Sequence, residues 1–315
     1  MLATQHADPA APRPNPPESP RTGGTLVSVA ALALVLLSAF LHAAWNLWAK
    51  QIGGDTRAAT LMGVLEAISV IAFAPAALLV AHAAHLTLDG RALAWIAGSG
   101  FLHVAYFLLL LRGYRVSELS VVYPVARGTG PLLAAIGAAL WLGERPTLLS
   151  VGGALLIALG IVILTLHPGE PRSGRVRAGV ILGALVGVTI GAYTLWDGAA
   201  VSKLALPPIL YYWGGELCRA LVFAPFVVAD RAGARLLWRE HRLRVLGIAL
   251  ASPIAYILVL VAMSRARVSH VAPVRELSIL FGAWFGARVL GEGDRARRRW
   301  AALAFVAGVL ALASA

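Results

Sequence analysis

Ten apolar segments follow one another along this chain, and each is about 20 residues long, enough to cross a bilayer as a helix. The chain is 59% hydrophobic and only 13% charged, with a mean hydropathy of +0.78, whereas soluble domains carry roughly a quarter charged residues. We therefore predict an all-α membrane protein with ten transmembrane helices. The spans are expected at 25–49, 59–83, 92–112, 119–142, 147–166, 178–197, 207–230, 244–263, 268–290 and 299–314.

The polar stretches divide the chain into few parts. Residues 1–24 hold six of the 17 prolines and no apolar period, which predicts a disordered tail. The next apolar run is too long for a signal peptide and is interpreted as the first span. A linker at 167–177 then separates a five-helix repeat at 25–166 from a second one at 178–315, and 231–243 is expected to be an arginine-rich loop.

The two halves match each other at offsets of 148 to 150 residues, which indicates an internal duplication. Pro124 corresponds to Pro273, and Arg127 corresponds to Arg275. Further pairs in the same order are Trp48 and Trp196, Glu66 and Glu216, Pro75 and Pro225, Tyr106 and Tyr256, Glu144 and Glu292. An odd number of spans in each repeat forces the two copies into opposite orientations, so we predict inverted repeats.

The net charge of +12 resembles that of nucleic-acid-binding proteins, but the arginines gather in short segments between spans, so no nucleic-acid partner is expected. Loops on one side of the predicted membrane hold 16 basic residues, and the tail and loops on the other side hold seven. By the positive-inside rule this distribution places both termini outside the cytoplasm, in a multi-pass protein of the cell (inner) membrane.

An ordered set of motifs makes the sequence similar to the drug/metabolite transporter superfamily, in particular to its members with two EamA domains. The motifs are Trp45-Asn46 followed by Lys50, Tyr123-Pro124 with Arg127-Gly128, Leu142-Gly143-Glu144, Pro273 with Arg275-Glu276, and Leu290-Gly291-Glu292. The resemblance implies ten helices around a central cavity and transport of small metabolites such as amino acids. Members of the family commonly have both termini in the cytoplasm, opposite to the charge distribution here.

Arg127 and Arg275 lie inside the fourth and ninth predicted spans, shortly after prolines that interrupt helix hydrogen bonding. An arginine at this depth is costly unless it is hydrated or paired. The two guanidinium groups are therefore expected either to bind a substrate carboxylate or phosphate, or to pair with Glu66, Glu216 or Glu276.

Glu66 and Glu216 lie at matching depths in the second and seventh spans. A carboxylic acid removed from water retains its proton more readily, so either residue could carry a coupling proton. The alternative is a permanent ion pair, because Arg219 follows Glu216 at helical spacing.

Aromatic and polar side chains near the end of the first span are candidates for the wall of a substrate cavity. Trp45 and Asn46 are expected to line it, while Trp48 and Lys50 also fit an interfacial belt with a snorkelling lysine. Tyrosine hydroxyls could contribute further substrate contacts, or else pack in the core with one hydrogen bond each; these tyrosines are Tyr106, Tyr123, Tyr193 and Tyr256.

Glu144 and Glu292 each follow a glycine at a predicted helix exit and are expected to lock a loop through a salt bridge or to act as gates. Glycines at GxxxG spacing, including Gly183, Gly187 and Gly191, predict close helix packing within the fold or in a homodimer. No phosphate loop, zinc motif or nucleophile elbow is present in the sequence, so we expect no cofactor, no metal and no enzymatic activity.

These features predict a secondary transporter that moves a small polar or zwitterionic, amino-acid-like metabolite across the lipid bilayer by alternating access, in the direction of export. An organic-anion or sugar-phosphate exchanger is the first alternative, favoured if both arginines are free in the cavity. An intramembrane lipid-modifying enzyme is a second, which would require acidic or histidine side chains clustered at one interface. A third is a scaffold without transport, in which all buried charges would be paired.

Overall fold

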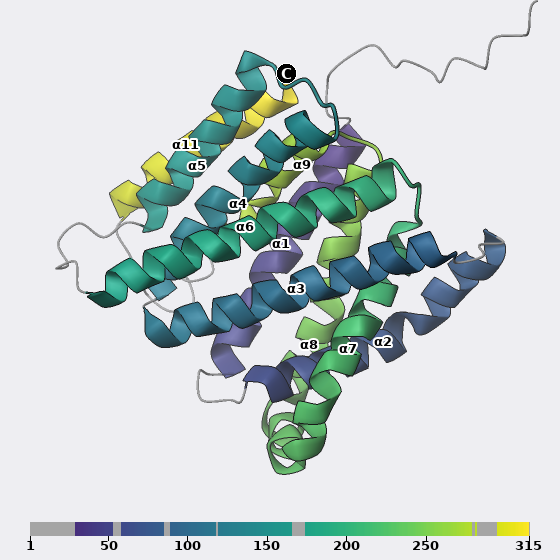
Figure 1. Ribbon diagram of the computed structural model, residues 1–315. Coiled ribbons are helices and arrows are strands. Elements are labelled where there is room, and N and C mark those ends of the chain that lie inside the picture. Colours follow the sequence, from purple (N-terminus) through teal and green to yellow (C-terminus); the bar gives the residue numbers. More distant parts are fainter. Residues whose placement is uncertain are drawn as a thin grey trace, which may run out of the picture.

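The computed structural model describes residues 29–52, 58–84, 89–117, 119–165, 174–278, 281 and 295–314, and all regular structure within them is helical (Figure 1). The helices are α1 (Val29–Ile52), α2 (Ala58–Ala83), α3 (Gly90–Val116), α4 (Leu119–Trp141), α5 (Leu148–Thr165), α6 (Gly174–Ser202), α7 (Pro208–Ala229), α8 (Arg231–Met263), α9 (Val268–Arg275) and α11 (Arg295–Ala313). The predicted all-α fold is confirmed. The tail at 1–24 lies outside the described residues, as does most of the linker at 167–177.

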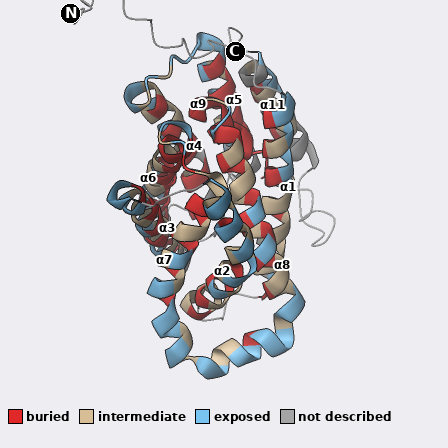
Figure 2. Cartoon of the chain, turned by 90° about the vertical axis from the view of Figure 1, so that its right-hand side faces the viewer, coloured by how far each residue is buried: buried red, intermediate tan, exposed pale blue. Residues whose placement is uncertain are grey.

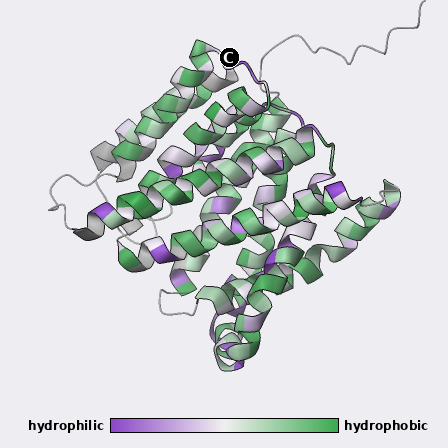
Figure 3. Cartoon of the chain, viewed as in Figure 1, coloured by the Kyte–Doolittle hydropathy of each residue, from purple (hydrophilic) through white to green (hydrophobic). Residues whose placement is uncertain are grey.

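The bundle presents apolar side chains outward, as a protein surrounded by lipid must. Ile71, Leu140 and Leu221 are 74%, 83% and 68% exposed. Hydrophobic residues accordingly cover much of the outer helices in Figure 3. Five described helices are long and apolar enough to cross a membrane by length and composition, and they include stretches Val29–Ala49, Ala58–Ala83, Gly90–Leu110, Arg177–Ser202 and Arg231–Met263.

The segment 231–243 is not the loop that its arginines suggest. Asp230 accepts a hydrogen bond from the backbone of Gly233 at 3.1 Å and so starts a helix at Arg231. This first part of α8 ends at a kink at His241, where φ is −129° and ψ is 18°, and the membrane-crossing part follows. The connection from α7 therefore forms a mostly exposed helical edge at the bottom of Figure 2.

The two proline-containing helices that carry the central arginines differ from each other. α4 continues through Arg127 to Trp141, whereas α9 ends at Arg275 with Glu276 as its C-cap. The predicted interruption of the helix at the arginine is therefore found in α9 but not in α4. Most of the remaining predicted ninth span lies outside the described residues.

Matching tryptophans show that the two repeats pack in the same way. A Cβ atom added to Gly98 on α3 would lie 2.7 Å from the ring of Trp196 on α6. The equivalent Gly247 on α8 would approach the ring of Trp48 on α1 to 2.8 Å. The contact of α3 with α6 is thus repeated by the contact of α8 with α1, and each glycine is needed for the close approach of the tryptophan ring.

The contact between α2 and α7 reveals how the repeats are oriented. Glu66 on α2 binds Arg219 on α7. The carbonyl of Val70, which follows Glu66 on α2, accepts a hydrogen bond from Trp213, which precedes Arg219 on α7. These two helices are copies of each other and run antiparallel. A two-fold axis that relates two antiparallel copies is perpendicular to both, so it lies in the plane of a membrane that both helices cross. The repeats are therefore inverted.

Small residues bring α4 and α6 together, and α6 lies between α4 and α3 in Figure 1. Added Cβ atoms at Gly183 and Gly191 on α6 would lie 2.9 Å and 3.0 Å from the Cβ atoms of Val125 and Leu133 on α4. The glycine spacing predicted to allow close packing is thus used within the fold.

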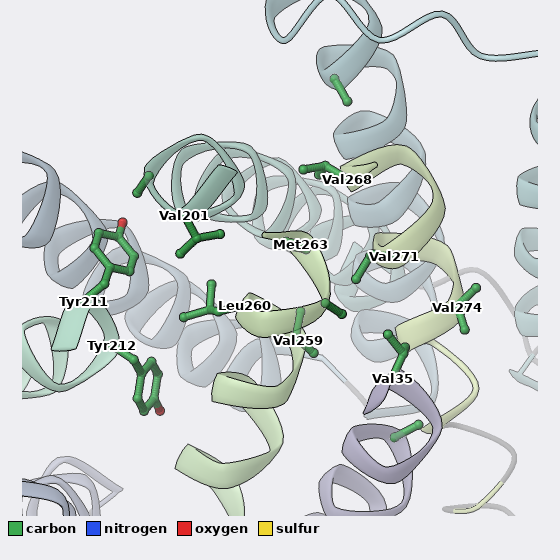
Figure 4. Packing of buried hydrophobic residues seen from close by; sticks show 14 of the residues in the cluster. Val35, Val201, Tyr211, Tyr212, Val259, Leu260, Met263, Val268, Val271 and Val274 are labelled. Carbon is green, nitrogen blue, oxygen red and sulfur yellow. The ribbon is translucent and has the colours of Figure 1, made fainter. Parts of the chain in front are cut away.

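The largest hydrophobic cluster fills one end of the bundle. It joins the end of α8 to α9, α6 and α1, through residues that include Val35, Val201, Leu260, Met263 and Val268 (Figure 4). Leu260 and Met263 are fully buried. This end of the molecule is closed by close-packed side chains.

Candidate substrate cavity

A cavity of about 300 Å³ lies in the bundle, and every described helix except α5 and α11 contributes to its wall. α1 contributes from Ser38 to Ala49 and α2 contributes Met62 and Glu66, so the cavity is displaced toward the end where α1 finishes and α2 begins. The predicted site residues that line it are Trp45, Glu66, Tyr106, Arg127, Arg219, Tyr256 and Arg275.

Arg127 and Arg275 share one buried counter-ion. The Nη1 atom of Arg127 lies 3.0 Å from both carboxylate oxygens of Glu276, and the Nε atom of Arg275 lies 3.6 Å from Oε1 of the same carboxylate. Glu276 is fully buried, while the two arginine side chains are 7% and 5% exposed. Among the described residues, two guanidinium groups therefore meet one carboxylate, which gives this wall an excess of positive charge.

Arg219 forms the opposite arrangement. Its Nε atom donates to Oε1 of Glu66 at 2.9 Å, and its Nη2 atom lies 3.9 Å from Oε1 of Glu216. The guanidinium group also lies over the ring of Tyr212, 5.2 Å from its centre. Here one cation meets two carboxylates, so negative charge is in excess.

A third polar group surrounds Asp197, a residue outside the predicted site. The hydroxyls of Tyr211 and Tyr256 donate to its two oxygens at 2.7 Å and 2.6 Å, and His103 on the cavity wall lies 3.9 Å away through Nε2. An aspartate within a predicted span, and a histidine within another, were the signals that could have indicated this group.

His42 is the other cavity residue that was missed. Its Nε2 atom contacts Nη2 of Arg127, and the ring of Trp45 meets its ring edge-on with centroids 4.9 Å apart. Trp45 therefore belongs to the cavity wall beside the arginines. Trp48 instead packs on Gly247, away from the cavity-lining set.

The predicted cavity tyrosines whose side chains the structure describes, Tyr106, Tyr193 and Tyr256, lie in one aromatic group. Tyr106 meets Tyr193 edge-on at 5.6 Å, and Tyr193 lies 6.1 Å from Tyr256. The hydroxyl of Tyr193 accepts a hydrogen bond from Arg275 at 3.4 Å. This group connects the arginine wall to Asp197 through Tyr256.

Within the described residues, Glu144 caps a helix instead of forming the salt bridge expected at its loop. Its two oxygens accept hydrogen bonds from the backbone of Val268 and Ser269 at 2.8 Å and 3.0 Å, so it caps the N-terminus of α9 in the other repeat. Glu292 lies outside the described residues, as do the side chains of Asn46, Lys50 and Tyr123.

Comparison with known proteins agrees with this architecture. Twenty-nine chains of solved structures match this chain. One of them, a protein crystal structure with 17% sequence identity, has a TM-score of 0.72 and covers 89% of this chain and 95% of its own. This similarity concerns the fold alone. No curated protein matches the sequence. The EamA-like transporter family matches residues 29–166, the first of the two repeats. Through this first repeat the chain matches a family of membrane transporters, and its inverted helical repeats enclose a charged cavity.

Proposed function

We propose that this protein is a secondary transporter for a small zwitterionic metabolite of the amino-acid type, and that it works as an exporter in the cell membrane. The observation that carries the proposal is the opposite charge excess of the two cavity walls. Arg127 and Arg275 share one carboxylate, and Glu66 and Glu216 share one guanidinium group. A carboxylate would bind at the first wall and an ammonium group at the second.

The aromatic side chains between these walls suit the rest of such a molecule. Tyr106, Phe107 and Trp45 line the cavity and offer apolar surface to a side chain. A volume of about 300 Å³ matches a small metabolite and is too small for most lipids or peptides.

The alternative of an organic-anion exchanger receives less support from this geometry. A phosphate or dicarboxylate carries about two negative charges, yet Glu276 lies within 3.6 Å of both arginines and leaves them an excess of one positive charge, which suits a single carboxylate better. A lipid-modifying enzyme is also less well supported, since the acidic side chains lie inside the bundle rather than at one interface.

The inverted packing supports alternating access as the proposed mechanism. The cavity is displaced toward one end of the bundle, and the opposite end is closed by the hydrophobic cluster around Met263. If each repeat adopted the conformation of the other, the end near the cavity would close and the end filled by the hydrophobic cluster would open.

Proton coupling is part of the proposal. Among the described residues that line the cavity or lie directly behind its wall, three guanidinium groups are accompanied by four carboxylates: Arg127, Arg219 and Arg275 with Glu66, Asp197, Glu216 and Glu276. Such a set carries one excess negative charge when all members are ionised. A single bound proton would neutralise it, which is favoured inside a membrane.

The test uses purified protein in liposomes and a panel of radiolabelled amino acids, with and without a pH gradient. We expect accumulation of at least one amino acid that is lost in Arg275→Gln and is stimulated by the gradient. The exposed Arg239→Gln is a matched control and should transport normally. Absence of transport for the whole panel, together with transport of phosphate esters or dicarboxylates, would favour the anion exchanger instead.

A further inference from the structure

Asp197 is a buried carboxylate whose hydrogen-bond partners carry no positive charge. The side chain is fully buried, and both carboxylate oxygens accept hydrogen bonds from tyrosine hydroxyls, Tyr211 at 2.7 Å and Tyr256 at 2.6 Å. These hydroxyls satisfy hydrogen bonding but supply no positive charge. A buried carboxylate without a nearby cation is costly in a membrane protein.

The side chain of His103 is oriented to supply that charge. Its Nδ1 atom lies 2.9 Å from the carbonyl oxygen of Ser99, which can only accept, so Nδ1 carries a hydrogen. The other nitrogen, Nε2, faces Oδ2 of Asp197 at 3.9 Å. In the neutral ring this nitrogen presents a lone pair to the carboxylate, whereas in the charged ring it presents an N–H group.

The location of the pair gives it access to protons and a connection to the arginine wall. The His103 side chain is 14% exposed and lines the cavity, whereas Asp197 has no exposed surface. The imidazole ring stacks on Tyr193 with centroids 4.3 Å apart, and the hydroxyl of Tyr193 accepts a hydrogen bond from Arg275. A charge on His103 would thus be felt where a substrate carboxylate is proposed to bind.

The groups that face His103 come from four helices. Asp197 and Tyr193 lie on α6, Tyr256 on α8 with its ring 5.4 Å away, Arg219 on α7 and Arg275 on α9. The carboxylate favours a charged imidazole and the two guanidinium groups oppose it. Binding of a substrate anion at the arginines would change this balance, which links the substrate to the proton.

We infer that His103, with Asp197 as its counter-charge, is the site that binds the coupling proton. This inference rests on the proposed function and extends it to a residue pair outside the duplicated glutamates. The pair has no equivalent in the other repeat, because Ala49 stands near the position of Asp197 and Pro253 stands at that of His103. A single proton site is what the single excess charge of the cavity requires.

Magic-angle-spinning NMR of the full chain in lipid vesicles, with ¹⁵N-labelled histidine, tests the inference with the proton itself as the probe. The His103 signal is assigned by its loss in His103→Gln, and His241 at the α8 kink serves as an internal reference. On acidification, we expect the His103 ring to change from the neutral Nδ1–H form to the doubly protonated form. In Asp197→Asn its proton affinity should fall by roughly tenfold or more, because an ion pair at this distance is lost.

A second variant keeps the test decisive if Asp197→Asn does not fold. Tyr256→Phe removes one hydrogen bond from Asp197 and leaves its carboxylate, so the proton affinity of His103 should rise instead of falling. The inference would be overturned if the His103 ring became doubly protonated at the same pH in the wild type and in whichever variant folds. It would also be overturned if the ring never became charged. Titration of His103 in a protein that transports none of the amino acids tested would leave the proton site standing and refute the transport proposal alone.

Discussion

The charge of Glu276 can be removed by Glu276→Gln with almost no change in shape. Its carboxylate lies 3.0 Å from Arg127 and 3.6 Å from Arg275, and all three side chains are nearly inaccessible. At an effective dielectric constant of about 20, opposite charges roughly 4 Å apart attract by about 4 kcal/mol. Measured losses for breaking a buried pair are about 3–5 kcal/mol, because the remaining charge stays desolvated. We expect the variant to lose stability by about 3–5 kcal/mol.

Equilibrium unfolding in mixed micelles, followed by tryptophan fluorescence, measures this loss. The matched control is Glu240→Gln, since the Glu240 side chain is 58% exposed and its replacement should cost less than about 0.5 kcal/mol. A second change, Arg127→Gln in the Glu276→Gln background, should cost less than it does alone, because the two residues are in contact. Equal stability of the two glutamine variants, or strict additivity in the double variant, would refute the role of Glu276 as shared counter-ion.

Three further variants probe packing, capping and orientation. Gly98→Ala places a methyl group 2.7 Å from the Trp196 ring and should cost about 1–3 kcal/mol in the same unfolding assay, whereas Gly90→Ala meets nothing within 4 Å and should be neutral. Glu144→Ala removes both cap hydrogen bonds of α9 and should cost about 0.5–2 kcal/mol; an unchanged midpoint would show that the cap is not needed. Arg235→Cys, in an otherwise cysteine-free chain, should react with an impermeant maleimide from the cytoplasmic side alone, and labelling from outside would reverse the orientation given by the loop charges.

The sequence was sufficient to predict what depends on length, composition and repetition. Helices that cross a membrane must satisfy their backbone internally, so apolar runs locate them to within a few residues. Repetition then placed Arg127 and Arg275 at matching depths, and both line the cavity. The segment that begins at Arg231 differs from the predicted loop, because its dense arginines suggest a loop while the Asp230 cap and an exposed surface permit a helix.

The sequence predicts pairing of the arginines with Glu66, Glu216 or Glu276 as one alternative, but it does not determine which carboxylate each arginine meets. Arg275 and Glu276 are adjacent in the chain, but only the fold brings Arg127 to the same carboxylate, 149 residues away. The polar cluster of His103 and Asp197 was missed for a related reason. Each is a single polar residue in an apolar run, without a repeat partner, and their proximity depends on how α3 packs against α6.

The inverted duplication explains why one glutamate has to serve two arginines. Two equivalent residues that lie near the two-fold axis between the repeats are close to each other. A duplicated arginine at such a position therefore lies near its equivalent in the other repeat, and the two positive charges repel. Arg127 and Arg275 are such copies, and Glu276 lies between them. The equivalent position in the first repeat is Gly128, which carries no charge. An unduplicated residue of opposite sign is therefore what lets the symmetric pair remain buried.

The same reasoning applies with reversed signs on α2 and α7, and there it gives a test. Glu66 and Glu216 are copies that both approach Arg219, and the first repeat has Ser69 at the position of that arginine. Arg219→Ser would restore the symmetry and leave two carboxylates with no guanidinium group between them, so it should destabilise the protein by about 3–5 kcal/mol. Adding Glu216→Gln removes one of the repelling charges and should recover part of that loss. A double variant that is no more stable than Arg219→Ser would show that the two carboxylates do not repel, and that Arg219 is held by contacts other than its charge.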